Sequence, residues 1–320
     1  MSSLLICTAC GTQFPTADRA VLTTCFICDD PRQYTPPSGQ AFTTMAELQQ
    51  QDGQRFRNEF TPLASDPKKQ QLISISTAPK FAIGQRAVLV RTPSGKNVLW
   101  DCVTLLDDDT AAAVDALGGL HAIVISHPHY YSTHADWAAR FACPVYLAAD
   151  DAAWIARRAD DDAYVFLRDV ETRIVLDGVD TGVMAIKLGG HFPGSLILLF
   201  DQHLLIADTL MTTPAGLANW AADAAGTARA RPAGANSFAF MWSIPNMIPL
   251  NAGEVARMWD ILQAYEFRST HGAFVGQDIE DSPSGGGGAG VKARVLESMQ
   301  IQVRAMGYAD HPFLQVRLRD

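Results

Sequence analysis

The sequence lacks any long hydrophobic run. No apolar stretch among the 320 residues approaches the roughly 18 residues that a membrane-spanning helix requires. The first ten residues, MSSLLICTAC, also lack the basic segment that opens a secretory signal peptide, and their apolar run is too short for one. We therefore expect a cytoplasmic protein with no membrane partner.

Positive charge is also scarce. The 25 Lys and Arg residues are outnumbered by 34 Asp and Glu residues, which gives a formal net charge of −9. A general nucleic-acid-binding protein carries a basic face, so this balance argues against one, although a local basic patch stays open. The mean hydropathy of +0.03 and the length fit one large or two ordinary globular domains. A small-molecule substrate is the expected partner, and a homo-oligomer is left open.

Four of the six cysteines form a regular pattern. Cys7 and Cys10 make one C-x-x-C pair, and Cys25 and Cys28 make a second pair after a gap of fourteen residues. Four thiolates delivered by two such pairs make a closed tetrahedral site that suits structural Zn²⁺. Iron, held as in rubredoxins, is the alternative. Gly11 directly follows the first pair and permits the tight turn that such a site needs.

The other two cysteines, Cys102 and Cys143, lie in apolar contexts. Cysteines in such surroundings behave as small buried hydrophobic residues. We predict no ligand role for either of them.

The pattern along the chain predicts three regions. Residues 1–35 form a small zinc-ribbon-like module, residues 36–75 form a connecting arm, and residues 76–320 form one α/β domain. The arm carries one short helix around TTMAELQQ, which Thr44 can cap. Strands are expected from about Phe81 onwards.

Alternating strand and helix patterns then follow, together with hairpins, so the sheet should be mixed rather than purely parallel. A glycine-rich loop is expected over residues 282–290. The main expected elements are the hairpin RAVLVRT and VLWDCVTLL, the strands GLHAIVIS and PVYLAA, and the helices DDDT (start only), ADWAARFA, DDAAWIARRA, NAGEVARMWDILQAYEF and VKARVLESMQIQVRAMGY.

Histidines and carboxylates follow several of the apolar runs. The segment SHPHYYSTH places His127 and His129 directly after the strand HAIVI. Later, His191 lies in the turn GGHFPGS, Asp208 ends the run LLIAD, and His271 ends another strand in STHGAF. Side chains at the carboxyl ends of strands meet at the edge where α/β active sites form. The pattern therefore indicates a metal site.

In this order and spacing the motifs resemble those of the metallo-β-lactamase superfamily, over roughly residues 75–275. The superfamily has an Asp after an early strand, then H-x-H-x-D-H, a G-H-x-P-G-S turn, an Asp and a final His. The resemblance implies a four-layer αββα sandwich with metal in a cleft at one edge. It assigns the early Asp to Asp101, which would orient a ligand or hold its loop. The chain looks closer still to an uncharacterised branch that carries a four-cysteine module as part of the same architecture.

This sequence departs from the H-x-H-x-D-H motif at two positions. Tyr131 and Ser132 stand where the resemblance implies two ligands of a second metal ion, and neither side chain is a good substitute. His134 comes two residues too late, and either swings in as a ligand or acts as a helix-start or supporting residue. We therefore expect one site built from His127, His129, His191 and Asp208, with an incomplete second site. His271 would assist it or bind substrate.

A three-histidine zinc site with an open position provides hydroxide at neutral pH. The chemistry implied is hydrolysis of an ester, lactone, thioester or phosphoester. Asp208 and His271 are the expected acid–base groups, and Tyr131 or its neighbour Tyr130 the expected hydrogen-bond donor to the developing oxyanion. The alternatives are a mononuclear non-haem iron (Fe²⁺) oxidoreductase resembling persulfide dioxygenases, and a non-catalytic binding protein. The apolar segment ANSFAFMWSIPNMIPL forms either a wall of the cleft or ordinary core.

Overall fold

The computed structural model of the protein describes residues 3–50, 56–63, 71–281 and 290–318. The glycine-rich loop expected over residues 282–290 lies outside the described residues, except for Gly290. None of the helices in the described ranges has the length and apolar character that crossing a membrane requires.

The first large sheet has seven strands in the order β3-β4-β5-β6-β7-β8-β9. Its first four strands pair antiparallel, which confirms the predicted hairpin between β5 and β6, and the pairs from β6 to β9 are parallel. The strands are β3 (Arg57–Pro62), β4 (Leu72–Ala78), β5 (Arg86–Val90), β6 (Val98–Trp100), β7 (Ala122–Val124), β8 (Val145–Ala148) and β9 (Tyr164–Leu167).

The second large sheet has six strands in the order β10-β11-β12-β13-β18-β19. All neighbouring strands are antiparallel except β13 and β18, which run parallel. The strands are β10 (Glu171–Leu176), β11 (Val179–Lys187), β12 (Leu196–Phe200), β13 (His203–Leu205), β18 (Ser269–His271) and β19 (Asp278–Glu280).

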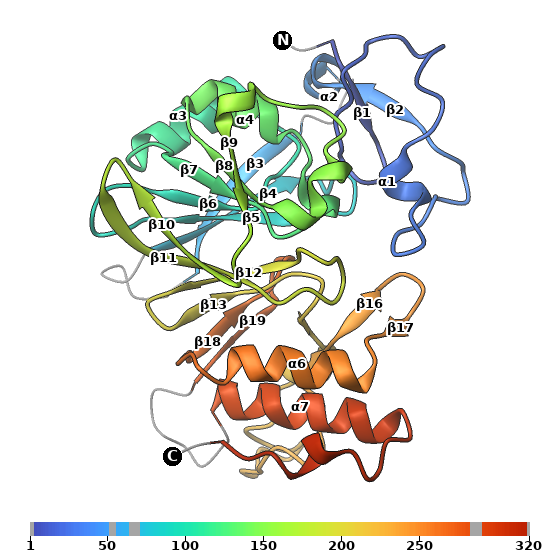
Figure 1. The fold of residues 1–320 in the computed structure, drawn as a ribbon, viewed down its shortest axis with the longest axis vertical. Coiled ribbons are helices and arrows are strands. Elements are labelled where there is room, and N and C mark those ends of the chain that lie inside the picture. Colours follow the sequence, from blue (N-terminus) through green and yellow to red (C-terminus); the bar gives the residue numbers. More distant parts are fainter. Residues whose placement is uncertain (1–2, 51–55, 64–70, 282–289, 319–320) are drawn as a thin grey trace.

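The two sheets pack face to face, and each carries helices on its outer side (Figure 1). Helices α3 (Asp108–Ala116) and α4 (His134–Phe141) cover the first sheet, whereas α6 (Ala252–Leu262) and α7 (Val291–Ala305) cover the second. One apolar core joins the sheets, because side chains of β6 and β7 share a cluster with those of β12 and β13. A second core lies beneath α6 and α7. The predicted αββα sandwich is confirmed.

Local sequence signals explain where several helices begin. Asp107 accepts a hydrogen bond from the Thr110 backbone N–H at 2.8 Å at the start of α3, where the acidic run was predicted to open a helix. In α2 (Met45–Gln50), Thr44 and Glu47 cap each other. The Thr44 hydroxyl accepts from the Glu47 N–H at 3.1 Å, and the Glu47 carboxylate accepts from the Thr44 N–H at 2.9 Å. The predicted cap is confirmed.

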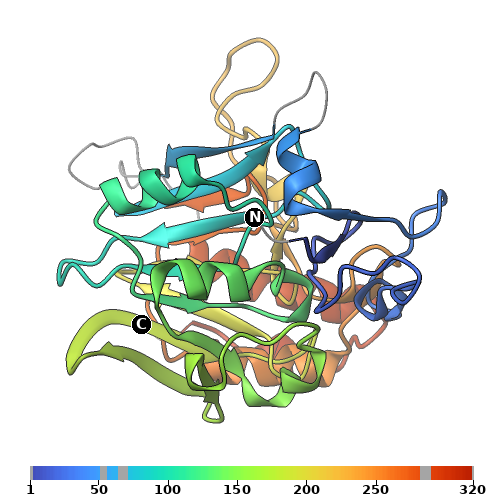
Figure 2. The same cartoon turned by 90° about the horizontal axis from the view of Figure 1, so that it is seen from above.

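The N-terminal module lies beside the sandwich, in dark blue at its upper right in Figure 1 and at its right edge in Figure 2. It contains β1 (Leu5–Cys7), α1 (Phe26–Asp29) and β2 (Phe42–Thr44), and β1 pairs antiparallel with β2. The module thus closes on itself before the chain enters the sandwich.

Two expectations about elements need correction. Strands were expected only from about Phe81, but the first sheet begins earlier. Strand β3 lies within the expected arm, and β4 crosses its end, so the boundary at residue 76 falls inside β4. The polar edge strand β3 alternates only between exposed and half-buried side chains, which weakens its apolar signal. The segment DDAAWIARRA forms a short 3₁₀ helix over Ala149–Trp154 instead of an α-helix.

A long connection after Asp208 carries several small elements and includes the apolar segment ANSFAFMWSIPNMIPL. Phe238 and Phe240 are fully buried in the core under α6 and α7, as ordinary packing would require, whereas Trp242 is half-buried near the histidines. The small elements are β14 (Met211–Thr212), α5 (Pro214–Leu217), β15 (Phe238–Ala239), β16 (Met241–Ser243) and β17 (Ile248–Pro249).

Candidate metal centres

The four cysteines of the two C-x-x-C pairs converge on one point. The sulfur of Cys7 lies 3.7 Å from that of Cys28, and the sulfur of Cys10 lies 3.7 Å from that of Cys25. A regular tetrahedron with metal–sulfur bonds of about 2.3 Å has edges of about 3.8 Å. All four thiols are buried and none forms a disulfide. The cluster therefore has the size and shape of a site for a single tetrahedral ion.

The backbone around this cluster is shaped by Gly11. Its φ of +82° lies in the left-handed region, and a Cβ at this position would stand 2.2 Å from the Thr104 hydroxyl of the sandwich. The Gly11 N–H donates to the Cys7 carbonyl at 2.8 Å. A glycine is thus required both by the knuckle turn and by its close approach to the sandwich.

The second cluster gathers three histidines and one carboxylate from three separate loops. His127 follows β7, His129 lies in a 3₁₀ turn over Pro128–Tyr130, His191 lies between β11 and β12, and Asp208 follows β13. Their ligand atoms all lie within 4.8 Å of one another, so this group can hold a metal ion. These four are the ligands expected from the sequence.

One carboxylate oxygen of Asp208 faces one ring nitrogen of each histidine in this cluster. The Asp208 Oδ2 atom lies 3.5 Å from His127 Nε2, 3.9 Å from His129 Nδ1 and 3.7 Å from His191 Nε2. His129 Nδ1 and His191 Nε2 lie 3.1 Å apart. Bonds of about 2.0–2.1 Å to a central ion correspond to tetrahedral edges of about 3.3–3.4 Å, so the four atoms have the spacing of a tetrahedral site.

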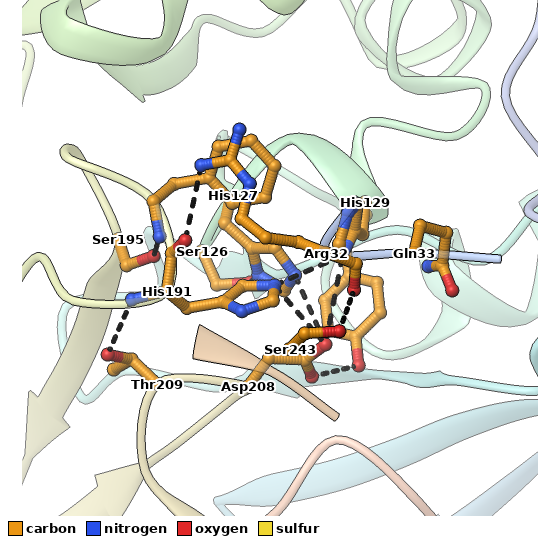
Figure 3. Close-up of polar contacts among 12 residues, drawn as sticks. Arg32, Gln33, Ser126, His127, His129, His191, Ser195, Asp208, Thr209 and Ser243 are labelled. Atoms are coloured by element: carbon orange, nitrogen blue, oxygen red, sulfur yellow. Dashed lines mark hydrogen bonds and ion pairs between the residues drawn. The ribbon is translucent and has the colours of Figure 1, made fainter. Parts of the chain in front are cut away.

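Hydrogen bonds behind the ligands set their orientation (Figure 3). His191 Nδ1 donates its proton to the Trp242 carbonyl at 2.7 Å, and this leaves the Nε2 lone pair directed at the cluster. His127 Nδ1 lies 2.9 Å from the Ser126 hydroxyl, and the Tyr130 hydroxyl donates to Asp208 Oδ1 at 2.7 Å. Within the described residues His127 Nε2 is buried without a hydrogen-bond partner, as expected of an atom reserved for a metal ion.

Burial and neighbouring charges set the pKa values of His129, His191 and Asp208. Desolvation lowers the pKa of His129 to about 4 and holds that of His191 well below its ordinary value. Burial alone would raise the pKa of Asp208, but the surrounding histidines hold it well below the ordinary carboxyl value. Neutral imidazoles and an ionised carboxylate at neutral pH are the forms that bind a cation.

Asp101 does not touch the metal-ligand cluster and contacts it through Ser126. It has a left-handed φ of +60°, is fully buried, and accepts a hydrogen bond from the Ser126 N–H at 2.7 Å. Burial raises its pKa to about 7. Because Ser126 in turn contacts His127, Asp101 lies where a residue that orients a ligand should lie.

The structure does not bring His271 into the cluster. Its Nδ1 lies 2.8 Å from the Asp278 carboxylate, and its Nε2 lies 3.2 Å from the Ser269 hydroxyl and 3.1 Å from His203 Nδ1. Asp278 also pairs with the buried Arg86 guanidinium of the first sheet at 2.6 Å. His271 therefore belongs to a polar tie between the two sheets, because both of its ring nitrogens are engaged there.

Tyr131 and His134 also lie outside the cluster. The Tyr131 hydroxyl donates to the Asp151 carbonyl at 3.3 Å, whereas it is the neighbouring Tyr130 that contacts Asp208. His134 is buried with Nδ1 2.8 Å from the Tyr131 carbonyl and Nε2 2.8 Å from the Tyr164 hydroxyl. It therefore does not swing in to replace the missing ligand and instead supports the start of α4.

Ser132, at the other altered position of the motif, contacts the N-terminal module. Its carbonyl accepts a hydrogen bond from the Gln13 N–H at 3.2 Å, and its hydroxyl lies 3.0 Å from that of Thr104. A second link runs from the Gln13 amide to Asp136 at 3.0 Å. The loop that the superfamily pattern assigns to a second metal ion is here part of the surface on which the module docks.

Sequence reasoning missed three residues at this site. Trp242 fixes His191 through a backbone carbonyl, which any residue type provides, so no sequence signal exists for it. Arg32 donates to the His191 carbonyl at 3.2 Å and pairs with Asp30 at 2.7 Å. Asp30 and Arg32 follow closely after Cys28, in the segment DDPRQ, and this position beside the cysteine cluster was the sequence signal for them.

Comparison with known proteins agrees with this geometry. A model of the metallo-beta-lactamase superfamily matches residues 83–261, which is more than half of the chain. The uncharacterized protein YmaE of Bacillus subtilis (strain 168) is 35% identical over 278 residues, which cover 84% of this chain and 88% of YmaE.

Solved structures share the fold at low identity. A structure of TMB-1 is 10% identical and superposes with a TM-score of 0.50, over 78% of this chain and 98% of that chain. A B3 metallo-beta-lactamase with an active-site glutamic acid is 13% identical, with a TM-score of 0.42 over 80% of this chain and 91% of that chain.

Proposed function

The chain belongs to the metallo-beta-lactamase superfamily, and we propose that it is a metal-dependent hydrolase of a small ester, lactone, thioester or phosphoester. The observation that carries the proposal is the orientation of the ligands. Each of His127, His191 and Asp208 has one hydrogen bond behind it and a second ligand atom that faces the other members of the cluster. Such outer hydrogen bonds are typical of functional metal sites.

Zinc is the metal that we propose for both clusters. Four buried thiolates suit a structural zinc ion, and three imidazoles suit a catalytic one that would keep its fourth position for water, beside Asp208. At the second cluster a bound ion would lower the pKa of a water molecule to about 7 and polarise the scissile oxygen. A single ion is favoured there, because none of Tyr131, Ser132, His134 and His271 directs a ligand atom at the cluster.

The side chains then have separate roles in hydrolysis. Asp208 Oδ2 faces the three histidines and can accept a proton from the attacking water, while its Oδ1 is held by the Tyr130 hydroxyl. We assign the hydrogen-bonding role to Tyr130 instead of Tyr131, since only the Tyr130 hydroxyl reaches the cluster. Asp101 positions His127 through Ser126.

The deciding experiment is metal content per chain, measured by elemental mass spectrometry on the wild type and on a His127→Ala/His129→Ala variant. A His121→Ala/His311→Ala variant is the matched control, since it removes two imidazoles away from both clusters. We expect two zinc ions in the wild type and the control, and one in the His127/His129 variant. Hydrolysis of a panel of activated esters, lactones and phosphoesters should disappear with that ion.

Other outcomes of this measurement have distinct meanings. Loss of iron from the His127/His129 variant would favour the oxidoreductase alternative, with thiol or persulfide oxidation as the next assay. Unchanged metal content in that variant would refute the proposed hydrolase, because the histidine cluster would then hold no metal.

A further inference from the structure

The segment that follows the fourth cysteine lies against the histidine cluster. Arg32 crosses to His191, where it donates to the backbone carbonyl at 3.2 Å, and its guanidinium carbon lies 3.6 Å from the centre of the Phe192 ring (Figure 3). A guanidinium at that distance from an aromatic face is attracted to it. The side chain is only 13% exposed. The N-terminal module thus contributes a buried cation to the surroundings of the metal centre.

Two residues of the long connection hold this segment in place. The Ser243 hydroxyl donates to the Arg32 carbonyl at 3.2 Å. The Asn246 side-chain amide donates to the carbonyls of Pro31 and Gln33 at 3.0 and 3.2 Å. Backbone contacts on both sides of Arg32 fix the position from which its side chain extends, so the guanidinium is pre-organised.

A cavity of about 410 Å³ opens beside Arg32. Gly189 and Gly190, which directly precede the ligand His191, form part of its wall together with Trp242. Trp242 also accepts the His191 hydrogen bond, so the cavity and the metal centre share a wall. A volume of this size accommodates a small molecule or part of one.

Three cations and one carboxylate line this cavity, and two further carboxylates, Asp30 and Asp150, pair with the cations from outside its lining. The cations are Arg32, Lys187 and Arg257, and the carboxylate is that of Glu254. The side chains of Arg32 and Lys187 are only 13% and 16% exposed, and such burial strengthens the field of a charge.

Backbone carbonyls orient each of these cations. Arg32 donates to the His191 carbonyl, Lys187 to the Arg168 carbonyl at 2.9 Å, and Arg257 to the Leu188 carbonyl at 2.5 Å. Each also has one carboxylate partner, at 2.7 to 2.8 Å. Because every cation carries several N–H donors, donors remain for a further oxyanion.

We propose that this cavity binds an oxyanion group, a carboxylate or a phosphate, of the molecule that the metal centre hydrolyses. The inference rests on the proposed function for the identity of that molecule, but the binding site itself does not depend on the metal. Arg32, Lys187 and Arg257 act as positioning residues, which hold the anionic end of the substrate while its scissile bond lies at the histidine cluster. Glu254 competes with the anion for Arg257.

The test is calorimetric titration of the full-length protein with inorganic phosphate and, separately, with acetate. Arg257→Gln and Lys187→Gln should each weaken binding about tenfold, as expected for loss of a charge-assisted hydrogen bond. Glu254→Gln should tighten binding, because it frees the Arg257 guanidinium. Arg304→Gln, which removes one positive charge from the exposed end of α7, is the matched control and should change binding less than about twofold.

The same titrations in the His127→Ala/His129→Ala variant separate this inference from the proposed function. Binding that persists there and weakens with Arg257→Gln supports the anion site, even if no hydrolysis is found. Binding lost in the His127/His129 variant but unaffected by Arg257→Gln would place the anion on the metal and overturn the inference. Absence of binding of both anions, or weaker binding in Glu254→Gln, would overturn it as well. The stronger of the two probes identifies the group as phosphate or carboxylate.

Discussion

The two clusters differ in where their ligands come from. The four cysteines lie within residues 7–28, whereas the four ligands of the second cluster are spread over residues 127–208. The cysteine sulfurs face one another within one short module, while His127, His191 and Asp208 are held from behind by residues of the sandwich, namely Ser126, Trp242 and Tyr130. The first cluster therefore organises its fold, and the second is organised by its fold.

The largest expected effect concerns the cluster that organises its fold. Cys28→Ser should remove the metal and the order of the module, because so short a segment has almost no core of its own. With a structural ion worth several kcal/mol, we expect the melting temperature to fall by about 10 °C or more. Scanning calorimetry measures this. Cys143→Ser, at a buried thiol outside both clusters, is the control. An equally small shift of the melting temperature in both variants would show that the cysteine cluster does not organise its fold.

The next effect concerns pH at the place where the two regions meet. His134 opens α4, next to the contacts of Gln13, and burial lowers its pKa to about 4. The folded state therefore binds fewer protons than the unfolded state, so stability is full above about pH 6.5 and falls as the pH drops towards 4. The shift corresponds to about 3 kcal/mol of unfolding free energy.

This dependence is isolated in the His127→Ala/His129→Ala background, where loss of metal at the second cluster cannot contribute. Urea unfolding at pH 7.5 and pH 4.5 should show a smaller difference once His134→Gln is added. The same difference with and without His134→Gln would show that other groups control the acid sensitivity of this region.

A smaller effect should separate structural histidines from ligands. His271→Ala should leave the metal content unchanged and lower the unfolding free energy by about 2 kcal/mol, because Asp278 and Ser269 lose a partner. His191→Ala should instead remove one ion per chain. Elemental analysis together with urea unfolding distinguishes the two, and loss of an ion in His271→Ala would show that this residue is a ligand.

The smallest effect concerns the support behind a ligand. Tyr130→Phe keeps the ring but removes the donor to Asp208 Oδ1. We expect metal affinity at the histidine cluster to fall by at least about tenfold, with the cysteine cluster unaffected. Competition with a chelator measures both affinities. Tyr131→Phe is the matched control, and equal effects of the two changes would contradict the assignment of Tyr130.

The sequence predicted those parts of the molecule that depend on local spacing. Paired cysteines, the capped helix at Thr44 and the H-x-H pair all act over a few residues, so their pattern is visible in the chain. The resemblance to a known superfamily supplied the long-range part, namely the αββα layers and the joining of His191 and Asp208 to the pair.

Side-chain direction was not predictable in the same way. Tyr130 and Tyr131 are adjacent and chemically identical, and only the 3₁₀ turn over Pro128–Tyr130 decides that the first one reaches Asp208. His271 occupies the expected place in the sequence, yet its ring contacts Asp278 instead of the cluster. Asp278 is itself paired with Arg86 of the other sheet. Such choices depend on distant partners along the chain, 78 residues apart for Tyr130 and Asp208 and 192 residues apart for Arg86 and Asp278.

The contacts that hold Arg32 also set an order of assembly. Its segment lies near the start of the chain, but Ser243 and Asn246, which fix it, come more than 200 residues later. At a synthesis rate of about 5–20 residues per second, the segment waits roughly 10–40 s on the ribosome before its docking surface exists. The cysteine module can bind its ion during this interval, whereas the histidine site can form only after most of the chain has been synthesised. The two metal centres of one chain can therefore be completed at different times, the cysteine cluster first and the histidine cluster later.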